Sequence, residues 1–209
     1  LYLYKRSLPR LMDLFFWPTM ELMVWGFLSL YLQKSQIGSF NIITVLLGAI
    51  IFWDLLSQSQ RAVSISFLED VWERNFLNIF VTPLKISEFL VSTVLLGLIR
   101  IFVVGLIMGV LSLLLYKFNI LAFGFYLLPF LINLLIFGWT LGLFTMAIIL
   151  RFGSSAQIIA FGLTMLIQPF SAVFYPVSAL PQSIQFISYF IPSTYIFEGM
   201  RSVVANHNL

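Results

Sequence analysis

A long uncharged apolar stretch constrains this chain more than any other feature. Thirty-three residues without a charge lie between Lys117 and Arg151, and a helix of about 20 apolar residues is enough to cross the hydrocarbon core of a bilayer. Hydrophobic residues make up 61% of the chain and charged residues 9%, whereas soluble domains have about 45–50% and about 25%. The sequence therefore predicts an all-α membrane protein.

Four further stretches have the length or apolar character of a membrane span. They are residues 14–32, which contain Glu21, residues 41–56, residues 86–116, which contain Glu88 and Arg100, and residues 155–174. We therefore expect five transmembrane helices in one domain over residues 1–209, after an interfacial segment at residues 1–12. Transporter subunits usually have an even number of spans, and the chain starts with Leu1, so we expect a fragment whose sixth span follows Leu209.

The last apolar stretch is too long for a single span. No charge occurs from Phe152 to Phe197, which is 46 residues. Four prolines interrupt it: Pro169, Pro176, Pro181 and Pro192. We predict one span followed by a re-entrant hairpin at residues 175–201, because irregular backbone at membrane depth survives only inside protein or along a wet cavity. The alternative, a hydrophobic surface loop, would expose Phe186 and Phe190 to water.

Basic residues in the expected connections predict the orientation, because Lys and Arg concentrate on the cytoplasmic side. Seven fall on one side and three on the other: Lys5, Arg6, Arg10, Arg61, Arg74, Lys85 and Arg151 against Lys34, Lys117 and Arg201. The sequence thus favours a cytoplasmic N-terminus and an outward-facing hairpin. The charges are too sparse for a nucleic-acid-binding surface.

Between the second and third spans the pattern changes to an amphipathic one. Apolar residues recur at helical spacing over residues 67–81; they are Leu68, Val71, Trp72, Phe76, Ile79 and Phe80. Ser66 and Glu69 have the spacing of a capping box, and Pro83 ends the pattern. We expect a short cytoplasmic helix, which either anchors the connection in the interface or docks a soluble partner.

Two motifs in this chain resemble permeases of the type 2 ATP-binding-cassette (ABC) exporters. The first is Glu69-Asp70-Val71-Trp72-Glu73-Arg74-Asn75, followed by Phe80-Val81-Thr82-Pro83-Leu84 and a long span. The second consists of Tyr175-Pro176-Val177, Leu180-Pro181, Ile191-Pro192-Ser193-Thr194-Tyr195 and Glu198-Gly199-Met200-Arg201. In that family the first corresponds to a cytoplasmic coupling helix and the second to an extracellular re-entrant hairpin. The order of the motifs matches over nearly the whole chain.

The resemblance implies specific partners. Two permease copies would dock on two cytoplasmic nucleotide-binding subunits, and the residues expected to contact them are Glu69, Asp70, Glu73 and Arg74. The chain lacks the Gly-x-x-x-x-Gly-Lys-Ser/Thr phosphate loop, so we expect it to be no enzyme and to hold no cofactor. ATP and magnesium would bind to the partner. The hairpin positions carried over are Pro176, Pro181, Pro192, Glu198 and Arg201.

Ionisable residues within spans are costly and usually face a protein interior or a wet cavity. Glu21, Asp54 and Arg100 lie within the expected spans. Two interpretations of Arg100 stay open: it pairs with Glu21 or Asp54, or it contacts a substrate. Gly105-x-x-x-Gly109 and Gly138-x-x-x-Gly142 permit close helix packing.

The function expected from these features is ATP-driven export of a lipid, a lipid-linked glycan or a hydrophobic small molecule across the plasma or inner membrane. A channel or scaffold without an ATPase partner is the alternative that the span pattern also allows. An intramembrane enzyme is less consistent, since the spans contain no Ser/His/Asp, His-rich or paired-carboxylate pattern.

Overall fold

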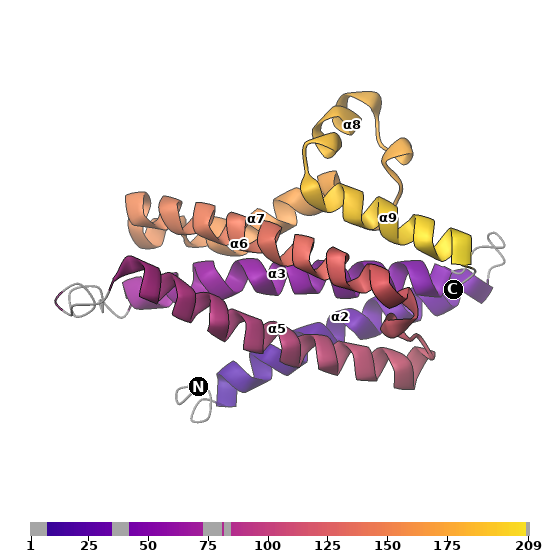
Figure 1. Cartoon of the computed structure of the whole chain (residues 1–209), viewed down its shortest axis with the longest axis horizontal. Helices are drawn as coiled ribbons and strands as arrows, with labels where there is room; N and C mark the ends of the chain where they lie inside the picture. Colours follow the sequence, from indigo (N-terminus) through magenta and orange to yellow (C-terminus); the bar gives the residue numbers. More distant parts are fainter. Residues whose placement is uncertain (1–7, 35–41, 73–80, 82–84, 208–209) are drawn as a thin grey trace.

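The computed structural model describes residues 8–34, 42–72, 81 and 85–207, and this part of the chain is helical without strands. The α-helices are α2 (Leu8–Lys34), α3 (Ile42–Trp72), α5 (Ile86–Tyr116), α6 (Leu127–Phe152), α7 (Gln157–Ile167), α8 (Gln182–Tyr189) and α9 (Pro192–His207). Short 3-10 helices join them: η1 (Ile120–Tyr126), η2 (Gly153–Ala156), η3 (Gln168–Ser171) and η4 (Val177–Ala179). The long helices lie side by side along one axis (Figure 1).

Helix α3 forms the centre of the bundle. It packs against α2, α5, α6, α7 and α9, and every residue from Thr44 to Gln60 is buried. The apolar character of residues 45–53 on all sides explains this position, because a helix that is hydrophobic all round gains most when it is surrounded.

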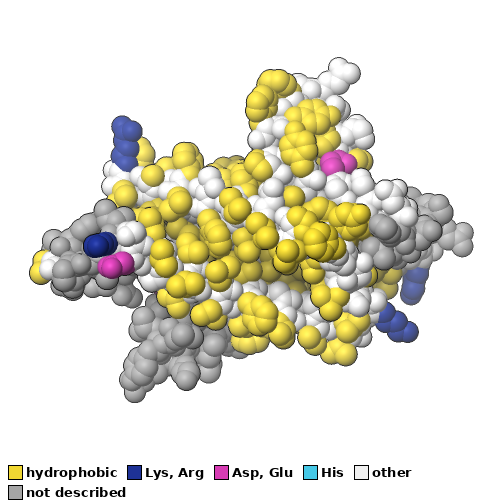
Figure 2. Space-filling view, viewed as in Figure 1, with side chains coloured by type: hydrophobic (Ala, Val, Ile, Leu, Met, Phe, Trp, Pro, Cys, Tyr) yellow, Lys and Arg dark blue, Asp and Glu magenta, His cyan; other side chains and the backbone are white. Residues whose placement is uncertain are grey.

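Helices α5 and α6 carry the surface that faces lipid. Three described stretches are long and apolar enough to cross a membrane: Ile42–Glu69, Ser87–Tyr116 and Ile120–Phe152. On the face shown in Figure 2, hydrophobic side chains cover the middle, and Lys and Arg side chains lie toward the two ends. That distribution suits a slab of hydrocarbon between two polar surfaces. The chain is therefore an all-helical membrane protein, and the count of five spans stays a prediction.

The N-terminal boundaries differ from the sequence expectation. Helix α2 runs without interruption from Leu8 to Lys34 and includes Pro18, so residues 8–12 belong to the same helix as the expected first span. Residues 1–7 of the expected interfacial segment lie outside the described residues. Proline is tolerated within membrane helices where neighbouring elements satisfy the backbone, and α2 packs against both α3 and α5.

The expected start of the coupling helix at Phe67 is wrong. Helix α3 continues through Ser66 to Trp72, so Ser66 and Glu69 lie inside a helix and do not cap one. Phe67 and Leu68 are buried against the end of α6, and this burial favours continued helix over a break. Residues 73–80 and 82–84 lie outside the described residues, so the rest of the expected 67–81 helix is not tested.

The C-terminal region consists of short helices. The α-helical part of the expected fifth span is only α7, Gln157–Ile167, flanked by η2 and η3, and it is shorter than the 155–174 span. Figure 1 shows α8 standing away from the bundle, whereas α9 returns along α6. Pro181 immediately precedes α8 and Pro192 is the first residue of α9. Proline favours helix starts because its missing N–H has no helical partner there.

Glycines bring α6 very close to α3. A Cβ atom at Gly138 would lie 2.6 Å from Ser59 Cβ, and one at Gly142 would lie 2.8 Å from Val63 Cβ. Only glycine fits at such distances, so the Gly138-x-x-x-Gly142 pattern serves packing within one subunit.

Candidate functional site

A group of polar side chains lies in the buried second half of α3. The uncharged members are Ser57, Gln58, Ser59, Gln60 and Ser64. Polar groups at membrane depth need hydrogen-bond partners, and α6 supplies several of them. Ser59 Oγ donates to the Leu135 carbonyl oxygen at 3.0 Å, and Gln60 Nε2 donates to Thr145 Oγ1 at 3.3 Å. These bonds, together with the glycine contacts, hold α3 and α6 in register.

A buried ion pair occupies another side of α3. Arg61 Nη2 lies 3.5 Å from Asp54 Oδ1, and the Asp54 side chain is 2% exposed. The two residues are seven positions apart, which is about two helical turns. Asp54 Oδ2 makes no hydrogen bond to any atom in the described residues. Arg61 was expected in a connection between spans and instead lies within α3.

The structure brings further charges to this ion pair. The negative charge of Asp54 and the positive charge of Arg61 both act on Glu21 of α2. The charge of Arg100, on α5, acts on Asp54. Three helices thus bring two carboxylates and two guanidinium groups to one region of the bundle, where the Arg61–Asp54 ion pair offsets part of the cost of burial.

This region opens into a pocket between α2, α3 and α7 with a volume of about 420 Å³. Its charged lining residues are Glu21, Asp54 and Arg61. Three tryptophans also line it: Trp17, Trp25 and Trp53. Trp25 stacks on Phe174 with ring centroids 4.0 Å apart. Ligand pockets in proteins commonly have about 300–1,000 Å³ and combine apolar walls with a few polar groups. The arrangement suits an amphipathic ligand that has both an apolar body and hydrogen-bonding groups.

Comparison with known families gives the identity of the bundle. The family model described as ABC-2 type transporter matches residues 4–205. The chain belongs to the ABC-2 type transporter family. This is the permease part of ABC-2 transporters, which in general pairs with an ABC ATPase. Searches of curated proteins and of solved structures found no match.

In this ABC-2 permease, Glu198 and Arg201 join α9 to residues 173–177, within and just before the predicted hairpin. Glu198 Oε1 accepts a hydrogen bond from the Val177 backbone N–H at 2.8 Å and one from Arg201 Nη2 at 3.1 Å. Arg201 Nη1 donates to the Val173 carbonyl oxygen at 3.2 Å. Pro176, which lies between these two backbone groups, precedes η4. The Glu-Gly-x-Arg pattern therefore holds the proline-rich turn in place.

The residues expected to contact the ATPase fall at the end of α3 and beyond. Glu69 and Asp70 lie in the last turn of α3. Glu73 and Arg74 lie outside the described residues. Sequence reasoning missed Arg61 and the tryptophans of the pocket. The signal for Arg61 is the polar run from Ser57 to Arg61, which has the composition of a connection and follows an apolar span; the tryptophans have no comparable signal.

Proposed function

We propose that this chain is the permease subunit of an ATP-driven exporter and that the pocket between α2, α3 and α7 forms part of its substrate pathway. The observation that carries the proposal is the set of charged residues Glu21, Asp54 and Arg61 at the wall of that pocket. Ionisable residues within a membrane domain are costly, and they often mark a substrate or ion pathway.

The energy source would be a separate cytoplasmic ATPase subunit that binds ATP and magnesium. Its contact residues on this chain would be Glu69, Asp70, Glu73 and Arg74, where complementary charges fix the register of the two subunits. A second copy of the permease would complete the pathway in a homodimer, with the N-terminus in the cytoplasm and the hairpin outward in the plasma or inner membrane.

The cargo would be a lipid, a lipid-linked glycan or a hydrophobic small molecule. The walls of the pocket support this class, because Trp17, Trp25 and Trp53 present apolar faces beside carboxylates that accept hydrogen bonds. A small inorganic ion would make no apolar contact with these tryptophan side chains.

The test is ATPase activity and cargo release from vesicles that contain the permease with its ATPase partner. Glu21→Gln keeps the size of the side chain and removes its charge, and it should reduce transport without loss of assembly because Glu21 lies at a half-buried position. Glu88→Gln, on the exposed first turn of α5, is the matched control and should leave transport unchanged.

Two outcomes would contradict the proposal. One is a Glu21→Gln variant with the transport rate of the wild type. The other is ion conductance through the permease alone without ATP, which would favour the channel alternative. Exchange of Glu73 and Arg74 for alanine should separate the ATPase from the permease, and an unchanged complex would contradict the docking assignment.

A further inference from the structure

An apolar groove opens on the lipid-facing side of the bundle, away from the charged pocket. It has a volume of about 580 Å³ and lies among α3, α5, η1 and α6. Its lining residues are apolar apart from Asn119 and include Leu55, Phe102, Gly105, Leu106, Gly109 and Leu131. The inference drawn from it requires only that the chain spans a membrane, and it does not depend on the exporter proposal.

The groove exists because α5 diverges from α3 toward its C-terminal end. A Cβ atom at Gly97 would lie 2.7 Å from Ala62 Cβ on α3. At Gly105 the nearest atom, Leu55 Cδ2, would be 3.3 Å away, and at Gly109 only Ile120 of η1 would come within 4 Å, at 3.8 Å. Helices α5 and α6 each pack on α3 but scarcely on each other. A wedge-shaped space therefore remains between them, with α3 as its floor.

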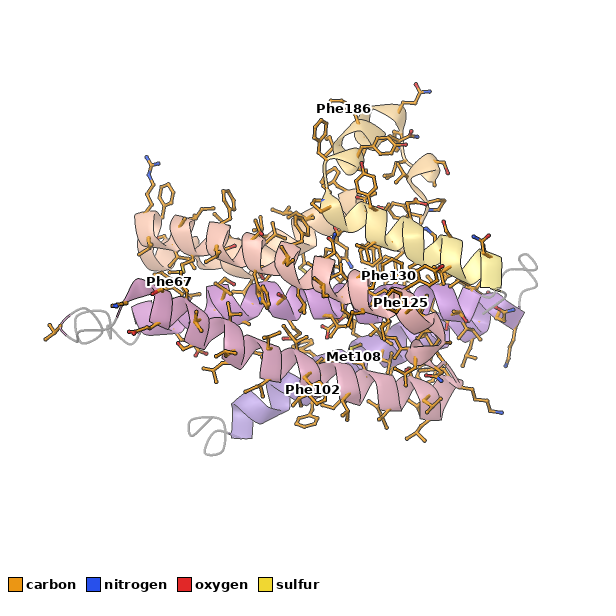
Figure 3. The ribbon with its side chains drawn as sticks, viewed as in Figure 1. Phe67, Phe102, Met108, Phe125, Phe130 and Phe186 are labelled. Carbon is orange, nitrogen blue, oxygen red and sulfur yellow. The ribbon has the colours of Figure 1, made fainter. Side chains whose placement is uncertain are left out.

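The depth of the groove suits one lipid chain. Its lining on α5 extends from Leu98 to Leu113, which is about 22 Å along a helix that rises about 1.5 Å per residue. One leaflet of the hydrocarbon core is about 15 Å deep. A lipid acyl chain that starts at the C-terminal end of α5 and lies in the groove thus extends past the middle of the membrane. Phe102, deep along the groove, is 70% exposed and projects outward from α5 in Figure 3.

One end of the groove has the polar side chain of Asn119 in its lining, and Lys117 lies two residues away in the sequence. Asn119 Oδ1 accepts a hydrogen bond from the Leu121 N–H at 3.0 Å and caps η1, and its side-chain NH2 group is a further donor. Lys117, two residues earlier, is exposed at the C-terminal end of α5. A cation and an amide donor at the polar end of an apolar groove match the phosphate of a phospholipid.

We propose that the groove binds a phospholipid, with one acyl chain between α5 and α6 and its phosphate at Lys117 and Asn119. The site is separate from the pocket of the candidate pathway, because α3 lies between the two: Asp54 lines the pocket, and Leu55 lines the groove. A second copy of the permease fits less well. A protein partner would have to insert apolar side chains into a cleft that ends beside the polar side chain of Asn119.

The experiment uses the assembled transporter in vesicles that contain phosphatidylglycerol with a photoactivatable diazirine on one acyl chain. After illumination, labelled positions are mapped by mass spectrometry. We expect the groove residues Leu106, Val110 and Leu131 to be labelled about tenfold more than the exposed Leu150 and Phe144 of α6, a preference of about 1.4 kcal/mol.

Gly109→Leu is the variant that should fill the groove. Its Cβ atom would meet Ile120 at an ordinary contact distance of 3.8 Å, so the backbone need not move. Labelling of the groove should then fall to the level of the other lipid-facing positions. Gly162→Leu places the same side chain where nothing lies within 4 Å and should leave labelling of the groove unchanged. In the wild type, labelling of the groove should be stronger with phosphatidylglycerol than with phosphatidylcholine. Lys117→Glu should remove this difference.

Even labelling around α5 and α6 in the wild type would overturn the proposal, and this result does not depend on the folding of any variant. The chain has no cysteine, so Leu106→Cys creates a unique thiol. Efficient disulfide formation between two Leu106→Cys copies in vesicles would show that a second subunit covers the groove, and it would also refute a lipid site.

Discussion

Glu198 Oε1 accepts a hydrogen bond from the backbone N–H of Val177 at 2.8 Å, across 21 residues of sequence. This contact joins α9 to the turn that precedes α8, and Arg201 strengthens it through its bond to Glu198. Because α8 stands away from the bundle in Figure 1, the position of the hairpin depends on a few polar contacts at its base. Phe186 on α8 lies far from the bundle core in Figure 3.

Removal of the Glu198 side chain should loosen the hairpin. Glu198→Ala loses the bond from Val177 and the partner of Arg201, and we expect a loss of free energy of unfolding of about 1.5–3 kcal/mol, the range for hydrogen bonds to charged groups. Glu198→Gln keeps an acceptor for Val177 and should cost less. Thermal unfolding in detergent measures both. Gln182→Ala, at an exposed position of α8, should have no effect, and an equal loss in all three variants would contradict this role.

Replacement of glycine by a larger residue at the α3–α6 contact should lower the free energy of unfolding. Gly142→Ala places a Cβ atom 2.8 Å from Val63 Cβ and 2.9 Å from the Gln60 carbonyl oxygen, and overpacking of this kind costs about 1–3 kcal/mol. Gly162→Ala, with open space around it, is the matched control. The free energy of unfolding in mixed detergent should fall for the first variant and stay constant for the second; the reverse order would refute the packing described here.

The ion pair on α3 should show coupling in a double-mutant cycle. Asp54→Asn leaves Arg61 without its partner, and we expect a loss of about 2–3 kcal/mol. Fully buried pairs cost about 3–5 kcal/mol to break, and the estimate is lower here because Arg61 is 32% exposed. Asp54→Asn combined with Arg61→Gln should be more stable than the sum of the two single changes predicts. Strict additivity would indicate that the two side chains do not interact.

The hydrogen bond from Gln60 to Thr145 should contribute modestly. Thr145→Val keeps the shape and removes the acceptor of the 3.3 Å bond. Interhelical hydrogen bonds in membranes contribute about 0.6 kcal/mol on average, so a loss of about 0.5–1 kcal/mol is expected. Thr140→Val, at an exposed site on the same helix, gives the reference value. If both variants lose the same free energy of unfolding, the hydrogen bond from Gln60 does not stabilise the α3–α6 contact.

The sequence by itself determined the all-helical membrane class, because residues 118–150 carry no charge and the 30 Å core of a bilayer accepts such a segment only as a helix or a closed barrel. It also predicted helix boundaries near Pro181 and Pro192, since proline lacks the backbone donor that the interior of a helix uses. The membrane class follows from local composition alone, whereas α2 continues through Pro18, so a proline predicts a boundary only together with its surroundings.

The tertiary structure decided the end of α3 and the partners of its charges. Residues 57–61 have the composition of a connection, yet they lie within α3, where Ser59 and Gln60 donate hydrogen bonds to Leu135 and Thr145 of α6. Likewise, Glu21, Asp54 and Arg100 come together from helices that are far apart in sequence. A hydrophobicity pattern predicts whether a segment lies in lipid or in water. It does not predict which side chain, distant in the sequence, will form the ion pair or hydrogen bond that replaces hydration of a buried charge.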